Sequence, residues 1–275
     1  MLIDNITDLH VHSSPSLVPR HGDDASTVAA NKLVGVSLSV LKAHEGSTAE
    51  RAIAVGESAI GGIVLNSPVG GPNPDAVEVA AHFGARVVWM PTISAPAHRA
   101  ANQSQELAVH RGVDLREVPV FDGTRLLSPW QEVLEVVAAH DLVLASGHLT
   151  CAEAVELFRA ARSAGVNRLL LTHPVLPFQN WDASLVPELR GMGVYLELSI
   201  LPDLAVGDSG PRSADIAEVY PGELLAFGGD LGHADFPRLE QALPEWLHSL
   251  VDRVGDAAAE KIMTTNGRTL VLAVG

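Results

Sequence analysis

The chain alternates between short apolar runs and amphipathic stretches. Runs such as LVLAS and RLLLT lack the polar alternation of a half-exposed strand, which predicts strands that are buried on both faces. We expect eight strands, at residues 6–12, 34–41, 62–66, 86–91, 142–148, 168–173, 193–199 and 225–230. Strands of this kind occur in parallel sheets that helices cover on both sides.

Helix signals separate these runs. Thr150 followed by Glu153, and Ser47 followed by Glu50, have the spacing of a capping box, and Asn73 precedes a proline at the start of another helical pattern. Strand, loop and helix thus alternate along the chain, and eight such units predict a closed (β/α)₈ TIM barrel.

The interval between the fourth and fifth expected strands, residues 92–141, is longer than the others. It contains EVPVFDGTRLLS, in which Asp122–Gly123 is a hairpin-turn signal. We expect a small β-hairpin inserted here instead of a second domain. Since no low-complexity linker divides the chain, residues 1–275 are expected to form one barrel domain.

The composition of the chain limits the classes of molecule that it is expected to bind. The 275 residues are 47% hydrophobic, and a net charge of −15 argues against nucleic acid or an anionic membrane as a partner. No secretory signal or membrane-spanning run is visible. The single cysteine, Cys151, excludes an internal disulfide and favours a reducing, cytoplasmic setting. A small-molecule substrate is expected, and a homo-oligomer is compatible with the sequence.

Six side chains that bind metals or carry charge fall at the C-terminal ends of the expected strands, where barrel enzymes build their active sites. His10 and His12 are two apart on the first strand, so both imidazoles point to the same face. The others follow later strands: Lys42 on the second, His148 on the fifth, His173 on the sixth and Asp230 on the eighth.

This set of residues indicates metal chemistry. Neutral imidazoles and a carboxylate bind one or two divalent ions, with zinc favoured and manganese, iron, cobalt or nickel as alternatives. A bound ion lowers the pKa of a water molecule, and Asp230 is the candidate general base for it. We interpret His82, His110, His140 and His248, on expected helices, as structural or solvated.

The motifs DLHVH at 8–12, SGH at 146–148, THP at 172–174 and GGD at 228–230 resemble, in order and placement, those of the amidohydrolase superfamily. The similarity is to its bare-barrel branches, which include the phosphotriesterase-like and TatD-like proteins, or to an uncharacterised branch. The resemblance implies a distorted barrel that hydrolyses amide, ester or phosphoester bonds. It also implies that His10, His12 and Asp230 hold one metal, and His148 and His173 the other.

The chain departs from this pattern at the fourth strand. That strand, RVVWMPT, lacks the lysine or glutamate that bridges two metals in many members of the superfamily. Lys42, in VLKAHEGST, could supply a bridging carbamate from the second strand, with Glu45 or His44 as substitute ligands. An unmodified Lys42 ammonium would instead contact the substrate.

Loops that follow the strands are expected to bind the substrate. After the fourth strand, for example, come His98 and Arg99. The candidates are Arg20, His21, His44, Arg99 and Trp181. Since arginine makes bidentate contacts to carboxylates and phosphates, the two arginines favour an anionic small molecule.

The leading hypothesis is a metal-dependent hydrolase of amide, cyclic amide or ester bonds. One alternative is a decarboxylase that resembles aminocarboxymuconate-semialdehyde decarboxylase, with one metal and an unmodified Lys42. DLHVHSSPS also resembles the first motif of the polymerase-and-histidinol-phosphatase (PHP) family of phosphoesterases, although its later motifs are not found. A catalytically silent metal-binding barrel is the third alternative, and it would not need Asp230 as a proton acceptor.

Overall fold

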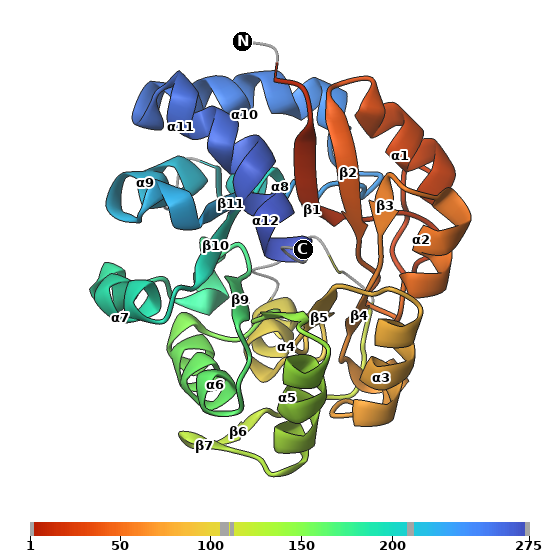
Figure 1. Cartoon of the computed structure of the whole chain (residues 1–275), viewed down its shortest axis with the longest axis vertical. Helices are drawn as coiled ribbons and strands as arrows, with labels where there is room; N and C mark the ends of the chain where they lie inside the picture. Colours follow the sequence, from red (N-terminus) through yellow and green to blue (C-terminus); the bar gives the residue numbers. More distant parts are fainter. Residues whose placement is uncertain (1–2, 105–109, 111–112, 208–211, 273–275) are drawn as a thin grey trace.

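A ring of parallel strands surrounded by helices forms the centre of the computed structural model, which describes residues 3–104, 110, 113–207 and 212–272 (Figure 1). All eight expected strands are present, so the (β/α)₈ barrel is confirmed. The strands of the ring are β1 Ile6–Val11, β2 Val36–Leu41, β3 Ala59–Ile60, β4 Gly62–Val64, β5 Val87–Trp89, β8 Val143–Ala145, β9 Arg168–Leu171, β10 Tyr195–Leu198 and β11 Leu225–Phe227.

Two hydrogen-bonded sheets make up this ring, in the orders β1-β2-β3 and β11-β10-β9-β8-β5-β4. They meet around Gly61. The third expected strand, residues 62–66, is represented by β4, which pairs with β5, and the additional short strand β3 precedes it and pairs with β2. On the other side the ring closes between β1 and the segment after β11. There Asp230 N donates to His10 O (2.8 Å), and His12 N donates to Leu231 O (3.0 Å).

The outer layer is helical. The helices are α1 Asp24–Lys32, α2 Ala49–Val55, α3 Pro74–His82, α4 Pro96–Gln103, α5 Pro129–Ala139, α6 Cys151–Ser163, α7 Val186–Gly191, α8 Ile200–Val206, α9 Ser213–Val219, α10 Leu239–Val254, α11 Asp256–Lys261 and α12 Gly267–Val271. Shorter helical turns are η1 Ser67–Val69, η2 Pro177–Gln179, η3 Ala183–Leu185, η5 Gly222–Leu224 and the π-helical η6 Ile262–Asn266. Among the described residues, no helix is long and apolar enough to cross a membrane.

One of the two expected capping boxes forms as predicted. Thr150 Oγ1 accepts from Glu153 N, and the Glu153 carboxylate accepts from Thr150 N, at the start of α6. The other differs, because α2 begins at Ala49 and Thr48, not Ser47, precedes it. The Thr48 hydroxyl caps no helix, since it donates to the carbonyl of Leu41 at the end of β2.

The expected hairpin lies between β5 and β8. It consists of β6 Phe121–Asp122 and β7 Arg125–Leu126, which pair antiparallel. Asp122 pairs with Arg125, so the turn residues are Gly123 and Thr124, one position later than expected. Cys151 is buried and free, as expected.

The C-terminal helix closes one end of the barrel. Leu270 and Val271 of α12 pack with the apolar side chains that fill the barrel, and Figure 1 shows α12 reaching toward the middle of the ring. Arg168, the first residue of β9, donates through Nη1 to the carbonyl of Leu270 (2.8 Å), and Arg86, just before β5, donates through Nε to that of Val271 (2.9 Å). Because both arginines lie where strands begin, α12 covers the N-terminal end and leaves the other end for a site.

Candidate metal centre

His10 of β1 and His12, the residue that follows this strand, meet Asp230 at the C-terminal end of the barrel. His10 Nε2 lies 2.9 Å from Asp230 Oδ1 and 3.2 Å from His12 Nε2. His12 Nε2 lies 3.2 Å from the same carboxylate oxygen. All three side chains are buried, and their donor atoms lie within 4.8 Å of one another. This spacing lets a single ion contact all three residues.

Hydrogen bonds on the far side of each ring orient the first two imidazoles. His10 Nδ1 lies 2.7 Å from Glu197 Oε1, and His12 Nδ1 lies 3.0 Å from the backbone carbonyl of Lys42. Both acceptors are oxygens at the other side of the ring from Asp230. The Nδ1 atoms therefore donate, and each Nε2 faces the centre of the site, as is usual for histidines that bind metals.

His173 is oriented in the same way. Its Nδ1 lies 3.1 Å from Gln179 Oε1, and Gln179 Nε2 donates to the carbonyl of Thr172 (3.0 Å), which keeps the amide oxygen turned toward the ring. His173 Nε2 then lies 3.8 Å from Asp230 Oδ2. Three imidazoles and one carboxylate thus converge, and we call His10, His12, His173 and Asp230 the candidate metal centre.

The charges at this centre fit a cation. Burial alone would raise the pKa of Asp230, but His10 first, then His12 and His173, outweigh it and hold that pKa well below its usual value. Burial would lower the pKa of His10, and the Asp230 carboxylate instead raises it. A proton between His10 Nε2 and Asp230 Oδ1 therefore stands where a divalent ion would bind, and binding of the ion would release it.

Lys42 reaches the same point from β2, as the sequence suggests. Its side chain is buried, its Nζ lies 3.0 Å from His10 Nε2, and burial lowers its pKa to about 8. An ammonium group at this distance competes with a metal ion for the lone pair of His10. An ion bound by His10 therefore requires Lys42 to be neutral, carbamylated or turned away.

His148 is placed differently from His173. Its ring centroid lies 5.2 Å from that of His173, but its Nδ1 is 2.8 Å from His98 Nδ1. Among the described residues, the compact group of three donors at this end of the barrel is His10, His12 and Asp230, and it includes neither His148 nor His173. His173 approaches the group through Asp230, since its Nε2 lies 3.8 Å from Asp230 Oδ2.

A pocket opens over the candidate metal centre. Its polar lining consists of His12, Arg20, His44, His98, His110, His148, His173 and Asp230, and Leu176, Leu201, Pro202 and Ala205 complete it. We call it the histidine pocket. Of the residues expected to bind substrate, Arg20 and His44 lie in this lining.

Several imidazole nitrogens of the histidine pocket have no protein partner. Within the described part of the chain, His44 Nε2, His98 Nε2 and His110 Nδ1 are buried without a hydrogen bond. Burial lowers the pKa of all three side chains, that of His98 to about 3, so the rings are neutral. Buried polar atoms are normally paired, so these nitrogens are available to a ligand.

Three expected substrate residues lie outside that lining. Arg99 pairs with Asp114 (2.8 Å), and Trp181 packs partly buried against the main hydrophobic core. His21 Nε2 lies 2.7 Å from the carbonyl of Phe236. Loop position alone does not fix which way a side chain turns, so the structure places Arg99, Trp181 and His21 outside this lining. A role for these residues in binding substrate stays a prediction.

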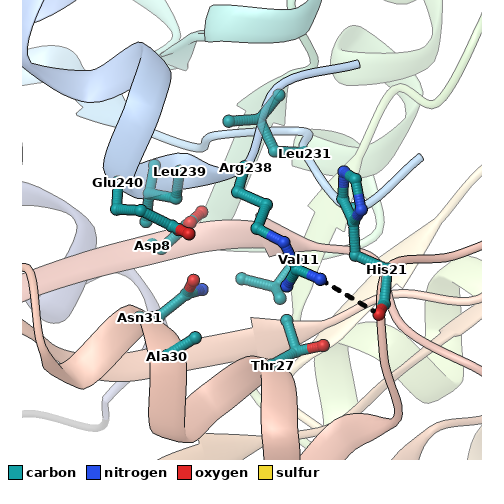
Figure 2. Close-up of a pocket in the computed structure, with 11 residues that line it drawn as sticks. Asp8, Val11, His21, Thr27, Ala30, Asn31, Leu231, Arg238, Leu239 and Glu240 are labelled. Atoms are coloured by element: carbon teal, nitrogen blue, oxygen red, sulfur yellow. Dashed lines mark hydrogen bonds between the residues drawn. The ribbon is translucent and has the colours of Figure 1, made fainter. Parts of the chain in front are cut away.

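His21 borders a different pocket, which lies between α1 and α10 (Figure 2). Arg238 Nη2 donates to the carbonyl of His21 there (3.5 Å). Asp8 also lines this pocket, and its Oδ1 accepts from the backbone N–H groups of His10 (3.0 Å) and Gly229 (2.8 Å). Burial raises the pKa of Asp8 to about 7. This carboxyl group ties the strand that carries His10 to the turn that carries Asp230.

Sequence reasoning missed three residues of the site. Glu197 is fully buried in β10, and a carboxylate inside the apolar run YLEL was the available signal. His98 lines the histidine pocket, whereas the sequence favours its neighbour Arg99. His110, expected to be structural on a helix, is a turn residue that lines the same pocket.

Glutamine in place of Glu197 should weaken metal binding by about 10- to 100-fold, because an amide is a poorer acceptor for the Nδ1 proton of His10. Zinc titration calorimetry on the metal-free variant would measure this loss. Glu135→Gln, at an exposed position of α5, is the control and should bind zinc as the wild type does. Equal affinity in Glu197→Gln would show that Glu197 does not support the metal centre.

Comparison with solved structures gives the fold its class. Similar chains include 2,6-dihydroxybenzoate decarboxylase complexed with 2,6-dihydroxybenzoate (10% identity over 98% of this chain and 99% of that one, TM-score 0.62). An amidohydrolase from Pseudomonas aeruginosa is similar as well (12%, 98% and 97%, 0.62), as is YJJV, a TatD homolog from Escherichia coli K12 (15%, 100% and 100%, 0.59). At these identities the likeness shows the barrel fold, which is the fold that the resemblance to the amidohydrolase superfamily implies.

A comparison with protein families assigns the chain to one family. The profile described as "Family of unknown function (DUF6282)" matches residues 5–197, and the chain belongs to this family. No curated protein matches the sequence.

Proposed function

We propose that this protein is a metal-dependent hydrolase that cleaves an amide, cyclic amide or ester bond of a small anionic molecule. The observation that carries the proposal is the convergence of His10, His12 and His173 on the Asp230 carboxylate at the base of the histidine pocket. The donor set of imidazole nitrogens and one carboxylate fits zinc, with manganese, iron, cobalt and nickel as alternatives.

A divalent ion held by these residues would lower the pKa of the attacking water and polarise the carbonyl group of the substrate. Asp230 supplies the base. Its Oδ1 faces His10 and His12 while its Oδ2 lies toward His173, so one oxygen can stay with the ligands and the other can accept a proton. The carboxyl group would then pass this proton to the leaving group.

Arg20 supports an anionic substrate. Its guanidinium lines the histidine pocket, its Nε donates to Ser16 Oγ (3.2 Å), and its Nη2 is buried with no partner in the described chain. Burial lowers the pKa of Arg20 to about 10, which leaves it charged at neutral pH. An unpaired buried charge of this kind is stabilised by a carboxylate or phosphate of the ligand.

Lysine in place of Arg20 should therefore lower kcat/KM by about 10- to 100-fold, the cost of losing one charge-assisted hydrogen bond. The effect should fall on KM, because this group lies away from the reacting bond. Arg99→Lys is the matched control, since Arg99 pairs with Asp114 outside the pocket. Steady-state kinetics with an active substrate would measure the change in kcat/KM. Equal losses in Arg20→Lys and Arg99→Lys would contradict the role of Arg20.

A decarboxylase is the second candidate. The compact donor group of His10, His12 and Asp230 at the barrel mouth suits one ion, the number expected for this reaction. One similar barrel is a 2,6-dihydroxybenzoate decarboxylase. A carbamylated Lys42 bridging two ions would favour hydrolysis instead.

One experiment separates these functions. The protein would be stripped with a chelator, reloaded with zinc, and given aryl esters, lactones, cyclic amides and hydroxybenzoates in ¹⁸O-labelled water. Hydrolysis predicts one ¹⁸O atom in the product acid and activity that returns only with the metal. Release of CO₂ without ¹⁸O incorporation would favour the decarboxylase. A folded protein that binds no divalent ion at His10, His12 and Asp230 would overturn both.

A further inference from the structure

A second group of metal-binding side chains lies on the outside of the barrel, between α3 and α5. Glu78 and His82 are one helical turn apart on α3, and His140 follows the last residue of α5. His140 Nε2 lies 2.8 Å from Glu78 Oε2, and His82 Nδ1 lies 3.4 Å from Glu78 Oε1. The two rings are 5.6 Å apart, and one donor atom of each residue lies within 4.8 Å of the others.

The position of this group favours a cation. His82 is the last residue of α3 and His140 is the C-cap of α5, so both helices direct their partially negative C-terminal ends toward it. Figure 1 shows the two helices side by side. His82 and His140 come shortly before β5 and β8, which places the group at the N-terminal end of the barrel, opposite the candidate metal centre.

The nitrogen of His82 that faces Glu78 is hydrogen-bonded. Its Nδ1 lies 2.9 Å from the backbone carbonyl of Glu78, which can only accept a hydrogen bond, so Nδ1 carries the proton. Because the same Nδ1 lies 3.4 Å from Glu78 Oε1, an ion bound there would displace that proton. The side chains of His82, Glu78 and His140 are 67%, 44% and 30% exposed, so water can complete the coordination.

We propose that Glu78, His82 and His140 form a surface site for a divalent ion of the zinc type, which clips α3 to α5. Two imidazoles and one carboxylate are three good ligands for zinc, nickel or copper and poor ones for magnesium or calcium. In a tetrahedral zinc site with ligand distances of about 2.0 Å, neighbouring donors lie about 3.3 Å apart, so small side-chain shifts would complete this one.

The chain supplies a matched control on α10. His248 Nε2 lies 3.5 Å from Asp252 Oδ2, also one turn apart and exposed to solvent. Within the described residues this pair has no third ligand in reach. A pair of this kind should bind zinc far more weakly than a group of three.

Zinc titration of the metal-free protein tests the proposal. Wild type should bind one zinc equivalent more than His140→Gln and His82→Gln, whereas His248→Gln should bind as many as the wild type. With zinc about 100-fold above the Kd, the rise in Tm should be larger by about 5 °C in the wild type than in His140→Gln. Unfolding without metal checks that the variants fold, and the difference between variants does not depend on occupancy of the candidate metal centre.

Two results would overturn the surface site. Equal stoichiometry and equal Tm response in wild type and His140→Gln would show that no ion binds there. A loss in His248→Gln as large as that in His140→Gln would show adventitious binding to surface histidines. Magnesium in place of zinc should give no Tm difference between the variants, and an equal response to both metals would also contradict the proposal.

Discussion

Asparagine in place of Asp230 should lower turnover by about 10²- to 10⁴-fold, the range that a positioned general base contributes. The amide has nearly the shape of the carboxylate but accepts no proton from water. The backbone N–H of residue 230, which donates to the carbonyl of His10, is unaffected. The barrel should therefore stay closed while the chemistry fails. Steady-state rates on any substrate active in the hydrolase screen, at equal metal content, would measure the loss.

Asp252→Asn is the control for this substitution, because Asp252 lies exposed on α10 and should be without effect. Metal analysis separates two causes of a loss. A variant that keeps its zinc and loses turnover has lost the base, whereas one that loses zinc has lost a ligand. Unchanged turnover in Asp230→Asn would remove the catalytic role proposed for this residue.

Alanine in place of Gly147 should lower the free energy of unfolding by more than about 4 kcal/mol, a size that marks severe steric conflict. Gly147 has φ +59°, and a Cβ atom on it would lie 2.3 Å from Met90 O and 2.7 Å from Pro91 O. These carbonyls cannot move freely, because His148 N donates to Pro91 O (3.0 Å). The substitution would therefore also displace His148 from the histidine pocket.

Gly123→Ala separates backbone strain from this collision. Gly123 has a similar φ of +61°, but nothing lies within 4 Å of a Cβ atom built on it. Its substitution should cost only the left-handed backbone penalty, about 1 to 2 kcal/mol. Urea unfolding of both variants would give the comparison. Equal losses would mean that the contact with Met90 and Pro91 is relieved at little cost.

Much of the barrel was predictable because strands such as β8 and β9 lie in continuous apolar runs that only a doubly covered sheet can bury. The strand pattern predicted that His10, His12, His148, His173 and Asp230 lie at the same end of the barrel, since parallel strands bring their C-terminal ends to one edge. Which of them converge on Asp230 could be read only from the structure. Lys42 could be placed there for the same reason, although its contact with His10 required the structure.

The rest of the site depends on features that a linear pattern does not contain. His98 and Arg99 are neighbours at the start of α4, and only the rotation of that helix sends one into the pocket and the other toward Asp114. His110 lies in the long interval between β5 and β8, where no periodicity indicates the path of the chain. Glu197 is one carboxylate in an apolar strand, and it can accept from His10 because the closure of the ring leaves only β11 between β10 and β1.

A metal ion at the candidate metal centre would also hold together the seam between β1 and the segment after β11. Asp8 and Gly229, which are bonded across the seam, lie 221 positions apart in the chain. An ion shared by His10, His12 and Asp230 would cross-link β1 to the segment after β11. This cross-link closes a long loop of the chain and lowers the conformational entropy of the open state. The metal-free protein should therefore open locally at this seam before it opens elsewhere. The amide protons of His12 and Asp230 should then exchange with solvent faster than they do in the metal-bound protein.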